Sequence, residues 1–216
     1  GERVLVTAGP TREPLDPVRF LTNRSSGRMG YAIAEAARDR GARVTLVSGP
    51  VALRPLDGVE MVPVETAEQM ARETLSRAHE QSIIVKSAAV ADYRPARAAG
   101  SKIKKTDDSV TLELERTTDI LAELGRVKGG AVLVGFAAET DDVLANARGK
   151  LERKNADLIV ANDVTAEGAG FDVDTNVATI VGRGGVEPLP RMSKRELADR
   201  ILDAALAVRV ERATRG

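Results

Sequence analysis

The sequence contains no cysteine, no tryptophan and a single histidine among its 216 residues. Without cysteine there can be no disulfide, no cysteine-ligated zinc, no iron–sulfur cluster and no thiol nucleophile. The one histidine, His79, excludes a two-histidine metal site within one chain, and its charged surroundings indicate an ordinary surface residue. Any chemistry of this chain must therefore use lysine, aspartate, asparagine and backbone groups.

Aromatic residues are also scarce, at 2%, and the charges balance, with 32 basic and 32 acidic residues. So few aromatics argue against a base-stacking platform, and zero net charge offers no global field for nucleic acid or an anionic membrane. The longest apolar run, residues 131–138, is far shorter than the roughly 20 residues of a transmembrane helix. We therefore expect a cytoplasmic protein without nucleic-acid or membrane partners. No signal peptide is visible, and the start at Gly1 indicates a processed product or an excised domain.

Short apolar segments alternate with helical patterns along most of the chain. The predicted strands cover residues 3–8, 43–48, 59–64, 83–89, 131–137 and 158–161. The predicted helices begin at Ser25–Gly27, at the capping boxes Thr66–Gln69 and Ser193–Glu196, at Thr118–Asp119 and at Val143. Strands that alternate with helices predict βαβ units and a parallel sheet.

Two segments depart from this alternation and predict antiparallel hairpins. In the first, residues 102–105 and 110–116 alternate apolar and polar side chains across a polar turn. The second lies within residues 171–189, where two apolar segments flank a glycine-rich turn. Residues 11–24 carry two prolines and several charges and predict a loop. Together these patterns predict one α/β domain over residues 1–216, a doubly wound, Rossmann-like, mostly parallel sheet with two hairpin excursions.

The connection after the first strand carries the most informative pattern. A dinucleotide-binding fold would place G-x-G-x-x-G there, directly before the helix, whereas this chain inserts about 15 residues first. Only then do Ser25, Ser26, Gly27 and Gly30 offer hydroxyl donors and a backbone that an anion can approach at a helix N-terminus. The second strand ends without the acidic residue that would bind an NAD ribose. The pattern favours phosphate binding; the alternative is that a serine caps the helix and the glycines ease helix–sheet packing.

Residues 8–30, AGPTREPLDPVRFLTNRSSGRMG, resemble the phosphopantothenate–cysteine ligase family. Further similar stretches are SAAVADYRP (87–95), KIKK (102–105), GFAAET (135–140), KLERKNADLIVANDV (150–164) and FDVDTN (171–176). The resemblance spans nearly the whole chain. It implies a ligase of coenzyme A biosynthesis that joins 4′-phosphopantothenate to cysteine through an acyl-cytidylate, consuming CTP and releasing CMP and pyrophosphate.

The resemblance also implies cofactors, partners and site residues. It implies Mg²⁺ held at Asp92, CTP as co-substrate, a homodimer, and fusion to or association with a flavin-dependent decarboxylase half. The implied catalytic residues are Asn23 and Lys102. The implied nucleotide-binding residues are Ser25, Ser26, Gly27, Lys86, Ser87, Ala88, Asp92, Lys102, Thr118, Asp119, Ile120, Leu121, Phe136, Lys150 and Lys154.

Each implied role has an ordinary structural alternative. Lys102 would compensate phosphate charge, but edge-strand lysines commonly just block strand pairing. Asn23 would orient the acyl-cytidylate, but asparagine is also a common turn residue. Lys150 and Lys154 lie four apart on one helix face and could equally be solvated. Phe136 would contact the nucleotide, although a phenylalanine at that position is usually core.

The remaining implied residues rest on backbone groups or small side chains. Asp92 follows a strand at the edge where ligands bind, and would meet the ribose or the metal. Ser87 and Ala88 would present backbone groups to the cytosine. This chain has Lys86 where relatives carry a small residue, so only a backbone role is implied there. Thr118 likewise replaces a proline of the family, while Asp119 and the backbone amides after it are expected near the triphosphate.

Three functions stay open on the residues alone: the CTP-dependent ligase, an NAD(P)-binding oxidoreductase domain, and a non-catalytic nucleotide-binding or dimerisation module. The first hairpin bears on assembly, because Ile103, Val110, Leu112 and Leu114 make it more apolar than an exposed ribbon should be. We expect the hairpins of two subunits to pair about a two-fold axis, with Lys102 serving the partner's site.

Overall fold

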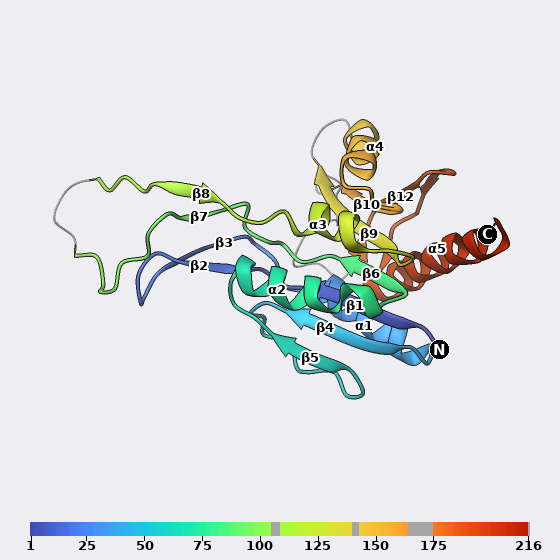
Figure 1. The fold of residues 1–216 in the computed structure, drawn as a ribbon, viewed down its shortest axis with the longest axis horizontal. Coiled ribbons are helices and arrows are strands. Elements are labelled where there is room, and N and C mark those ends of the chain that lie inside the picture. Colours follow the sequence, from blue (N-terminus) through green and yellow to red (C-terminus); the bar gives the residue numbers. More distant parts are fainter. Residues whose placement is uncertain (105–108, 140–142, 164–174, 216) are drawn as a thin grey trace.

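The computed structural model describes residues 1–104, 109–139, 143–163 and 175–215. Its core is an eight-stranded sheet of order β13-β12-β10-β9-β6-β1-β4-β5 (Figure 1). The parallel strands are β1 (Arg3–Ala8), β4 (Arg43–Ser48), β5 (Glu60–Pro63), β6 (Ile83–Lys86), β9 (Val132–Glu139) and β10 (Leu158–Asp163). The antiparallel strands are β12 (Ala178–Gly182) and β13 (Gly185–Pro188). The predicted Rossmann-like, mostly parallel sheet is confirmed.

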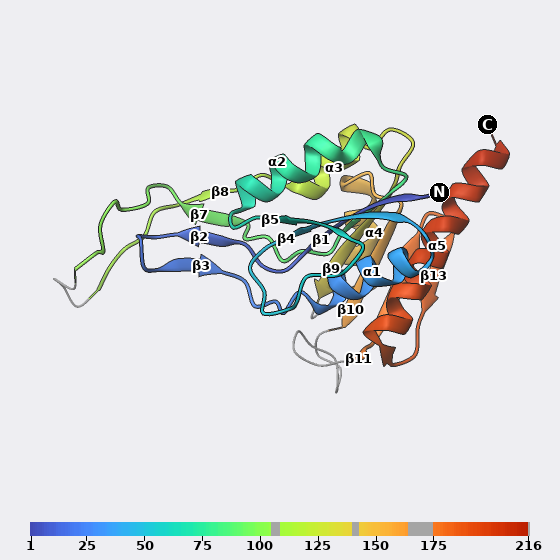
Figure 2. The ribbon, with the colours of Figure 1, turned by 90° about the horizontal axis from the view of Figure 1, so that it is seen from below.

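Helices cover both faces of this sheet because alternate strand residues point to opposite sides. In β1, Val4 and Val6 pack in the cluster formed by α1 (Arg28–Asp39) and α5 (Lys194–Arg215). Leu5 packs in the opposite cluster, which contains the helices α2 (Ala67–Arg77), α3 (Ile120–Val127) and α4 (Val143–Arg153). A short 3₁₀ helix, η1 (Ala78–Glu80), extends α2. Figure 2 shows α1 and α5 side by side on one face.

Side-chain caps place several helix starts where the sequence predicts them. The Thr66 side chain accepts from the Gln69 backbone N–H at 3.2 Å, and the reciprocal bonds of the capping box are present. Ser193 and Glu196 form the second box at the start of α5. Asp119 caps α3 by accepting from Ala122 N at 3.0 Å. These caps depend only on neighbouring residues, so the sequence alone reveals them.

The start of α1 differs from the serine-cap alternative. Gly27 is the N-cap residue at φ 76°, and no side chain caps the helix. A Cβ on Gly27 would lie 2.7 Å from Val51 Cγ1, so glycine is required both by backbone conformation and by space. At Gly30 a Cβ would lie 2.5 Å from Ala8 Cβ, which confirms that this glycine lets the helix approach the strand. Neither Ser25 nor Ser26 therefore caps α1 with its side chain.

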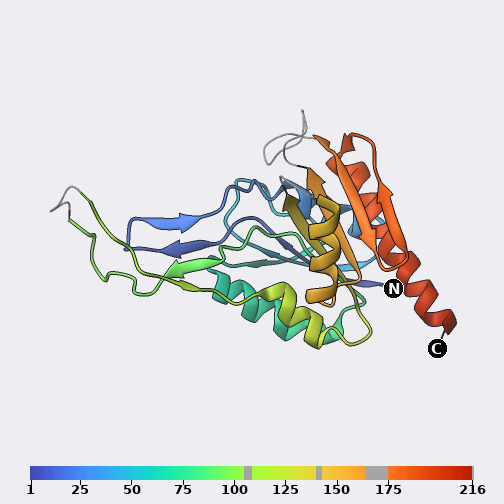
Figure 3. The same cartoon turned by 90° about the horizontal axis from the view of Figure 1, so that it is seen from above.

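The first predicted hairpin is wrong in its pairing. Strand β8 (Leu114–Arg116) pairs with β7 (Tyr93–Pro95), and the described residues 101–104 form no strand. The expected loop at 11–24 is also wrong, because β2 (Arg12–Pro14) pairs with β3 (Phe20–Thr22). The two ribbons lie side by side and project from the sheet (Figures 1 and 3). We call residues 12–22 and 93–104 with 109–116 the arm.

A buried carboxylate explains why residues 102–104 do not pair as expected. Asp16 Oδ2 accepts from the Ile103 backbone N–H at 3.1 Å, and Arg19 donates to the Ile103 carbonyl at 2.9 Å. The backbone groups of Ile103 are therefore bonded to the turn between β2 and β3. The Arg19 side chain also holds the pKa of Asp16 well below its usual range, despite burial of the carboxylate. This contact anchors the segment that carries Lys102.

The second predicted hairpin forms, but it does not leave the sheet. Strand β12 pairs antiparallel with β10, so the β12–β13 ribbon completes the sheet at its edge. A separate small pair joins β11 (Thr175–Asn176) to β14 (Met192–Ser193). Residues 164–174, which include part of the predicted excursion, and Lys105 of the KIKK segment lie outside the described residues.

Candidate active site

A cavity of about 520 Å³ lies at the carboxyl ends of β1, β6, β9 and β10. This is the edge at which open parallel sheets bind ligands. Ten of the residues implied by the sequence line it: Asn23, Ser25, Ser26, Gly27, Lys86, Ser87, Ala88, Asp92, Phe136 and Lys150. These residues come from positions 23 to 150 of the chain, so only the fold brings them together.

The other implied residues do not line this cavity: Lys102, Thr118, Asp119, Ile120, Leu121 and Lys154. Asp119 accepts from Lys154 Nζ at 2.5 Å, and the Asp119 charge reaches Lys86. Ile120 and Leu121 are 2% and 4% exposed, so their side chains belong to the core and only their backbone can serve a ligand. Thr118 is exposed and does not cap α3, because Asp119 does.

Lys102 does not line the cavity of its own chain. It is exposed and lies on the arm, next to Ile103, whose backbone is bound by Asp16 and Arg19. A single chain therefore does not bring the two implied catalytic residues, Asn23 and Lys102, into the same cavity.

The cavity is strongly cationic. Among the residues that the structure describes, its charged lining comprises five basic residues, Arg24, Arg28, Lys86, Lys150 and Lys194, and one acidic residue, Asp92. The N-terminus of α1 opens into the same space and adds its positive dipole end. A polyanionic ligand such as a nucleoside triphosphate matches this charge distribution.

The titration of Lys86 is perturbed by its surroundings in the cavity. Desolvation and the nearby Lys150 ammonium lower the pKa of Lys86 from 10.5 to about 8, partly opposed by the negative charges of Asp119 and Asp92. Its Nζ donates to the Ala88 carbonyl at 2.9 Å. Sequence reasoning implied only a backbone role for this residue, whereas the structure places its side chain among the cavity cations.

Asn23 is oriented by the backbone of a neighbouring connection. Its Nδ2 donates to the Val90 carbonyl at 3.0 Å. A carboxamide carries two N–H donors, so a second donor is available on the same nitrogen. Asn23 follows β3 directly, and Thr22 is itself tied to the Thr11 carbonyl at 2.7 Å. The base of the arm therefore positions Asn23 at the cavity.

Five polar residues of the cavity were missed by sequence reasoning: Arg24, Arg28, Asn162, Asn176 and Lys194. Lys194 Nζ donates to Asn176 Oδ1 at 2.5 Å, and Asn176 Nδ2 donates to Asn162 Oδ1 at 3.3 Å. Asn162 and Asn176 fall inside similar stretches quoted above, which was the available signal. Lys194 carried none, because it follows a capping box and resembles an ordinary first-turn residue.

Among the described lining residues, Asp92 is the one carboxylate that could contact a divalent cation in the cavity. The described residues contain no group of three or more histidine, cysteine, aspartate or glutamate side chains that could hold a metal by themselves. Mg²⁺ usually takes one or two carboxylates and completes its shell with substrate phosphates and water. The exposed Asp92 beside a cationic phosphate site fits that pattern.

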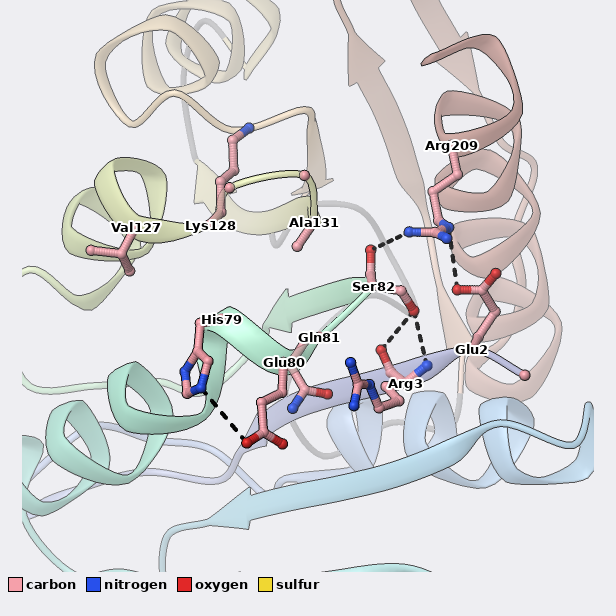
Figure 4. A pocket seen from close by; sticks show the side chains of 13 residues that line it. Glu2, Arg3, His79, Glu80, Gln81, Ser82, Val127, Lys128, Ala131 and Arg209 are labelled. Atoms are coloured by element: carbon pink, nitrogen blue, oxygen red, sulfur yellow. Dashed lines mark hydrogen bonds and ion pairs between the residues drawn. The ribbon is translucent and has the colours of Figure 1, made fainter. Parts of the chain in front are cut away.

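A second cavity, of about 480 Å³, lies near the N-terminus, at the opposite ends of β1 and β6 (Figure 4). Four of its side chains form two pairs: Arg209 with Glu2 at 3.2 Å and His79 with Glu80 at 3.6 Å. The His79 side chain is 73% exposed, which confirms the prediction of a surface residue. None of the catalytic or nucleotide-binding residues implied by the sequence lines this second cavity.

Comparison with known proteins places the chain in a family. A model described as the DNA/pantothenate metabolism flavoprotein C-terminal domain matches residues 1–208. The "Coenzyme A biosynthesis bifunctional protein CoaBC" of Bacillus subtilis is 53% identical over 210 residues, which are 96% of this chain and 52% of that protein. The protein of that name from Vibrio vulnificus is 48% identical over 92% of this chain and 50% of its own length. This chain thus spans about half the length of these relatives.

Solved structures agree with that placement. Among the described residues, every helix is too short or too polar to span a lipid bilayer. The crystal structure of the C-terminal domain of a CoaBC protein is 47% identical to this chain, and the match covers 98% of each chain with a TM-score of 0.83. The similarity to the phosphopantothenate–cysteine ligases is therefore confirmed, and this chain, which resembles the C-terminal domain of a CoaBC protein, belongs to the DNA/pantothenate metabolism flavoprotein C-terminal domain family.

Proposed function

We propose that this chain is a phosphopantothenate–cysteine ligase that uses CTP. The observation that carries the proposal is the convergence of ten implied residues on one cationic cavity at the carboxyl edge of the sheet. The bifunctional relatives are about twice as long, and the proposal assigns to this chain only the ligation step. An associated flavin-dependent decarboxylase activity would belong to a separate half.

The first step joins the carboxylate to the nucleotide. A carboxylate oxygen of 4′-phosphopantothenate attacks the α-phosphorus of CTP, the bond to the β-phosphate oxygen breaks, and pyrophosphate leaves. Lys86, Lys150 and the α1 N-terminus offset the charge of the triphosphate. Asp92 would hold Mg²⁺ together with phosphate oxygens, and the ion would supply further charge compensation.

The second step forms the amide. The cysteine amine attacks the acyl carbonyl of the acyl-cytidylate, a proton leaves the nitrogen, and CMP departs with the electrons of the acyl–oxygen bond. The N–H of Asn23 that is not bonded to Val90 is the donor for the developing oxyanion. Neither step needs a protein nucleophile, which agrees with a chain that has no cysteine.

The proposal includes a homodimer with composite sites. Six large hydrophobic side chains of the arm are exposed: Val18, Phe20, Tyr93, Val110, Leu112 and Leu114. Val110 is 64% exposed. A group of apolar side chains this exposed is typical of a surface that a partner covers. Pairing two arms about a two-fold axis would cover these residues. It would also carry Lys102 to the cavity of the neighbouring subunit, where its ammonium would meet the phosphates.

We expect pyrophosphate release from CTP and 4′-phosphopantothenate in the presence of Mg²⁺ and without cysteine, because activation precedes attack by the amine. A coupled pyrophosphate assay on the purified chain measures this directly. Release that strictly requires cysteine would contradict a separable acyl-cytidylate. Binding of CTP with no release at all would favour a non-catalytic nucleotide-binding module, and stabilisation by NADPH alone would favour an oxidoreductase domain.

A further expectation concerns pH. CTP affinity should fall roughly tenfold as pH rises through the Lys86 pKa of about 8, because only the protonated amine offers a charged donor. The last ionisation of the CTP phosphates, at about pH 6, is complete below the pH range in which Lys86 loses its proton. Titration calorimetry in buffers of different ionisation enthalpy should show proton uptake on binding. Lys86→Met should bind CTP more weakly and without this pH dependence; an unchanged dependence would assign the titration to another group.

A further inference from the structure

The peptide group that joins Val90 to Ala91 is hydrogen-bonded at both of its ends. Its carbonyl, on Val90, accepts from Asn23 Nδ2 at 3.0 Å. Its N–H, on Ala91, donates to the side-chain hydroxyl oxygen of Thr11, also at 3.0 Å. The hydroxyl of Thr11 therefore holds the far end of the same group that orients Asn23.

A peptide group transmits this constraint because it is rigid. It is planar, and in its usual trans form the N–H and the C=O point in opposite directions. Fixing the direction of the Ala91 N–H therefore fixes the direction of the Val90 carbonyl. Hydrogen bonds in such a chain also polarise one another, so the bond to Thr11 makes the carbonyl a better acceptor for the Asn23 amide.

A second connection joins Thr11 to the main chain beside Asn23. The carbonyl of Thr11 accepts from Thr22 Oγ1 at 2.7 Å, and Thr22 directly precedes Asn23. The bonds close a ring that runs from Thr11 through Thr22 to Asn23, and returns through the peptide of Val90 and Ala91. Both the place of the Asn23 backbone and the direction of its side chain thus refer to Thr11.

Thr11 itself is buried and firmly placed. It is 0% exposed, Ala91 is 6% exposed, and Thr11 does not line the active-site cavity. The following residue, Arg12, donates its backbone N–H to the Glu65 carbonyl at 2.8 Å. Without the hydroxyl the buried Ala91 N–H would lose its partner, and the peptide would have to turn to regain one.

We infer that Thr11 is a positioning residue for the amide-forming step. Its hydroxyl, acting through the peptide of Val90 and Ala91, holds the Asn23 amide so that the second N–H meets the oxyanion. This inference rests on the proposed function, in which Asn23 stabilises that oxyanion. The activation step does not depend on Thr11, because other groups offset the charge of the triphosphate.

Thr11→Val tests the inference, because it removes the hydroxyl and keeps nearly the same shape. Amide formation in a single turnover with cysteine should slow about 10- to 100-fold, the effect of a small misplacement of a catalytic group. Pyrophosphate release without cysteine and the dissociation constant of CTP should stay within about threefold. Thr11→Ser keeps the acceptor and should retain amide formation within about threefold. A purely structural role would lower the melting temperature and slow neither step selectively.

A double variant shows whether Thr11 acts through Asn23. In an Asn23→Ala chain there is no side-chain amide to orient, so adding Thr11→Val should slow amide formation by less than about twofold. If Thr11→Val slows the Asn23→Ala chain as much as it slows the unaltered chain, Thr11 acts on another group and the inference is overturned.

Two control variants separate this effect from burial and from stability. Thr74→Val makes the same substitution at a position that is also 0% exposed, where the hydroxyl has no hydrogen-bond partner among the described residues. Ser82→Ala removes two bonds to the Arg3 backbone, both 2.9 Å, near the opposite edge of the sheet. Ser82→Ala should lower the melting temperature, and both variants should form the amide at the native rate.

Other outcomes separate the inference from the proposed function. Native amide formation by Thr11→Val, or equal slowing of both steps, overturns the inference and leaves the ligase intact. If the unaltered chain releases no pyrophosphate, the proposed function falls before any variant is made. Should Thr11→Val fail to fold, Thr11→Ala is compared with Thr11→Ser: we expect amide formation at least about tenfold slower in Thr11→Ala, and equal rates contradict the inference.

Discussion

Asn23→Asp should bind CTP with near-normal affinity and form product about 10²–10³-fold more slowly, which corresponds to a loss of roughly 2.7–4 kcal/mol of transition-state stabilisation. The Asn23 amide donates to the Val90 carbonyl at 3.0 Å. A carboxylate cannot donate there, and it would repel both that carbonyl and the acyl phosphate. The variant therefore loses the orientation of the side chain and the donor for the oxyanion together. Single-turnover kinetics with cysteine, beside CTP titration, measure the two effects separately.

Asn155→Asp is the matched control for this experiment. Its Nδ2 also donates to a backbone carbonyl, that of Gly125, at 2.8 Å, and its φ of 47° is one that aspartate tolerates. Asn155 does not line the active-site cavity. The same amide-to-carboxylate change should lower the melting temperature and leave turnover unchanged. Near-normal turnover in Asn23→Asp would reduce Asn23 to a structural residue of the arm base.

Mixing two inactive variants should restore activity if the sites are composite. Lys102→Gln removes the arm lysine, and Asn23→Asp disables the cavity. In a hybrid dimer one cavity would combine the native Asn23 of one subunit with the native Lys102 of its partner. Random exchange makes half of the dimers hybrid, and each hybrid has one intact site, so the mixture should recover roughly a quarter of the native activity. Activity assays after subunit exchange, with sedimentation to establish the dimer, measure this.

Two controls make the exchange experiment decisive. A mixture of Asn23→Asp with Asn23→Ala should stay inactive, because every cavity lacks the native residue. A chain carrying both Lys102→Gln and Asn23→Asp should silence native subunits on mixing, since neither cavity of the hybrid retains both residues. If instead the native subunit keeps its activity in such hybrids, or the chain is a monomer in sedimentation, both catalytic residues act within one subunit and the composite site is refuted.

Local sequence patterns determined the sheet and the helix starts. Strand β1 is a β-branched run bounded by glycine and proline, and the Thr66 and Ser193 boxes satisfy helix N-termini within three residues. Such features depend on neighbours along the chain, so they are readable without a fold. The predicted phosphate-binding pattern at Ser25–Gly27 is likewise a local sequence feature, and these residues line the cavity.

Tertiary structure decided what depends on partners distant in sequence. The expected hairpin at residues 102–116 failed because Asp16 and Arg19, more than 80 residues away, bind the Ile103 backbone. Lys194 became a cavity residue because α5 packs against α1 and Asn176 holds its ammonium. Such long-range hydrogen bonds form only when the whole chain folds and loses its conformational entropy, so no local sequence pattern predicts them. The sequence by itself determined the class of fold and the chemistry expected, whereas the structure alone decided which side chains share the cavity and that Lys102 lies outside it.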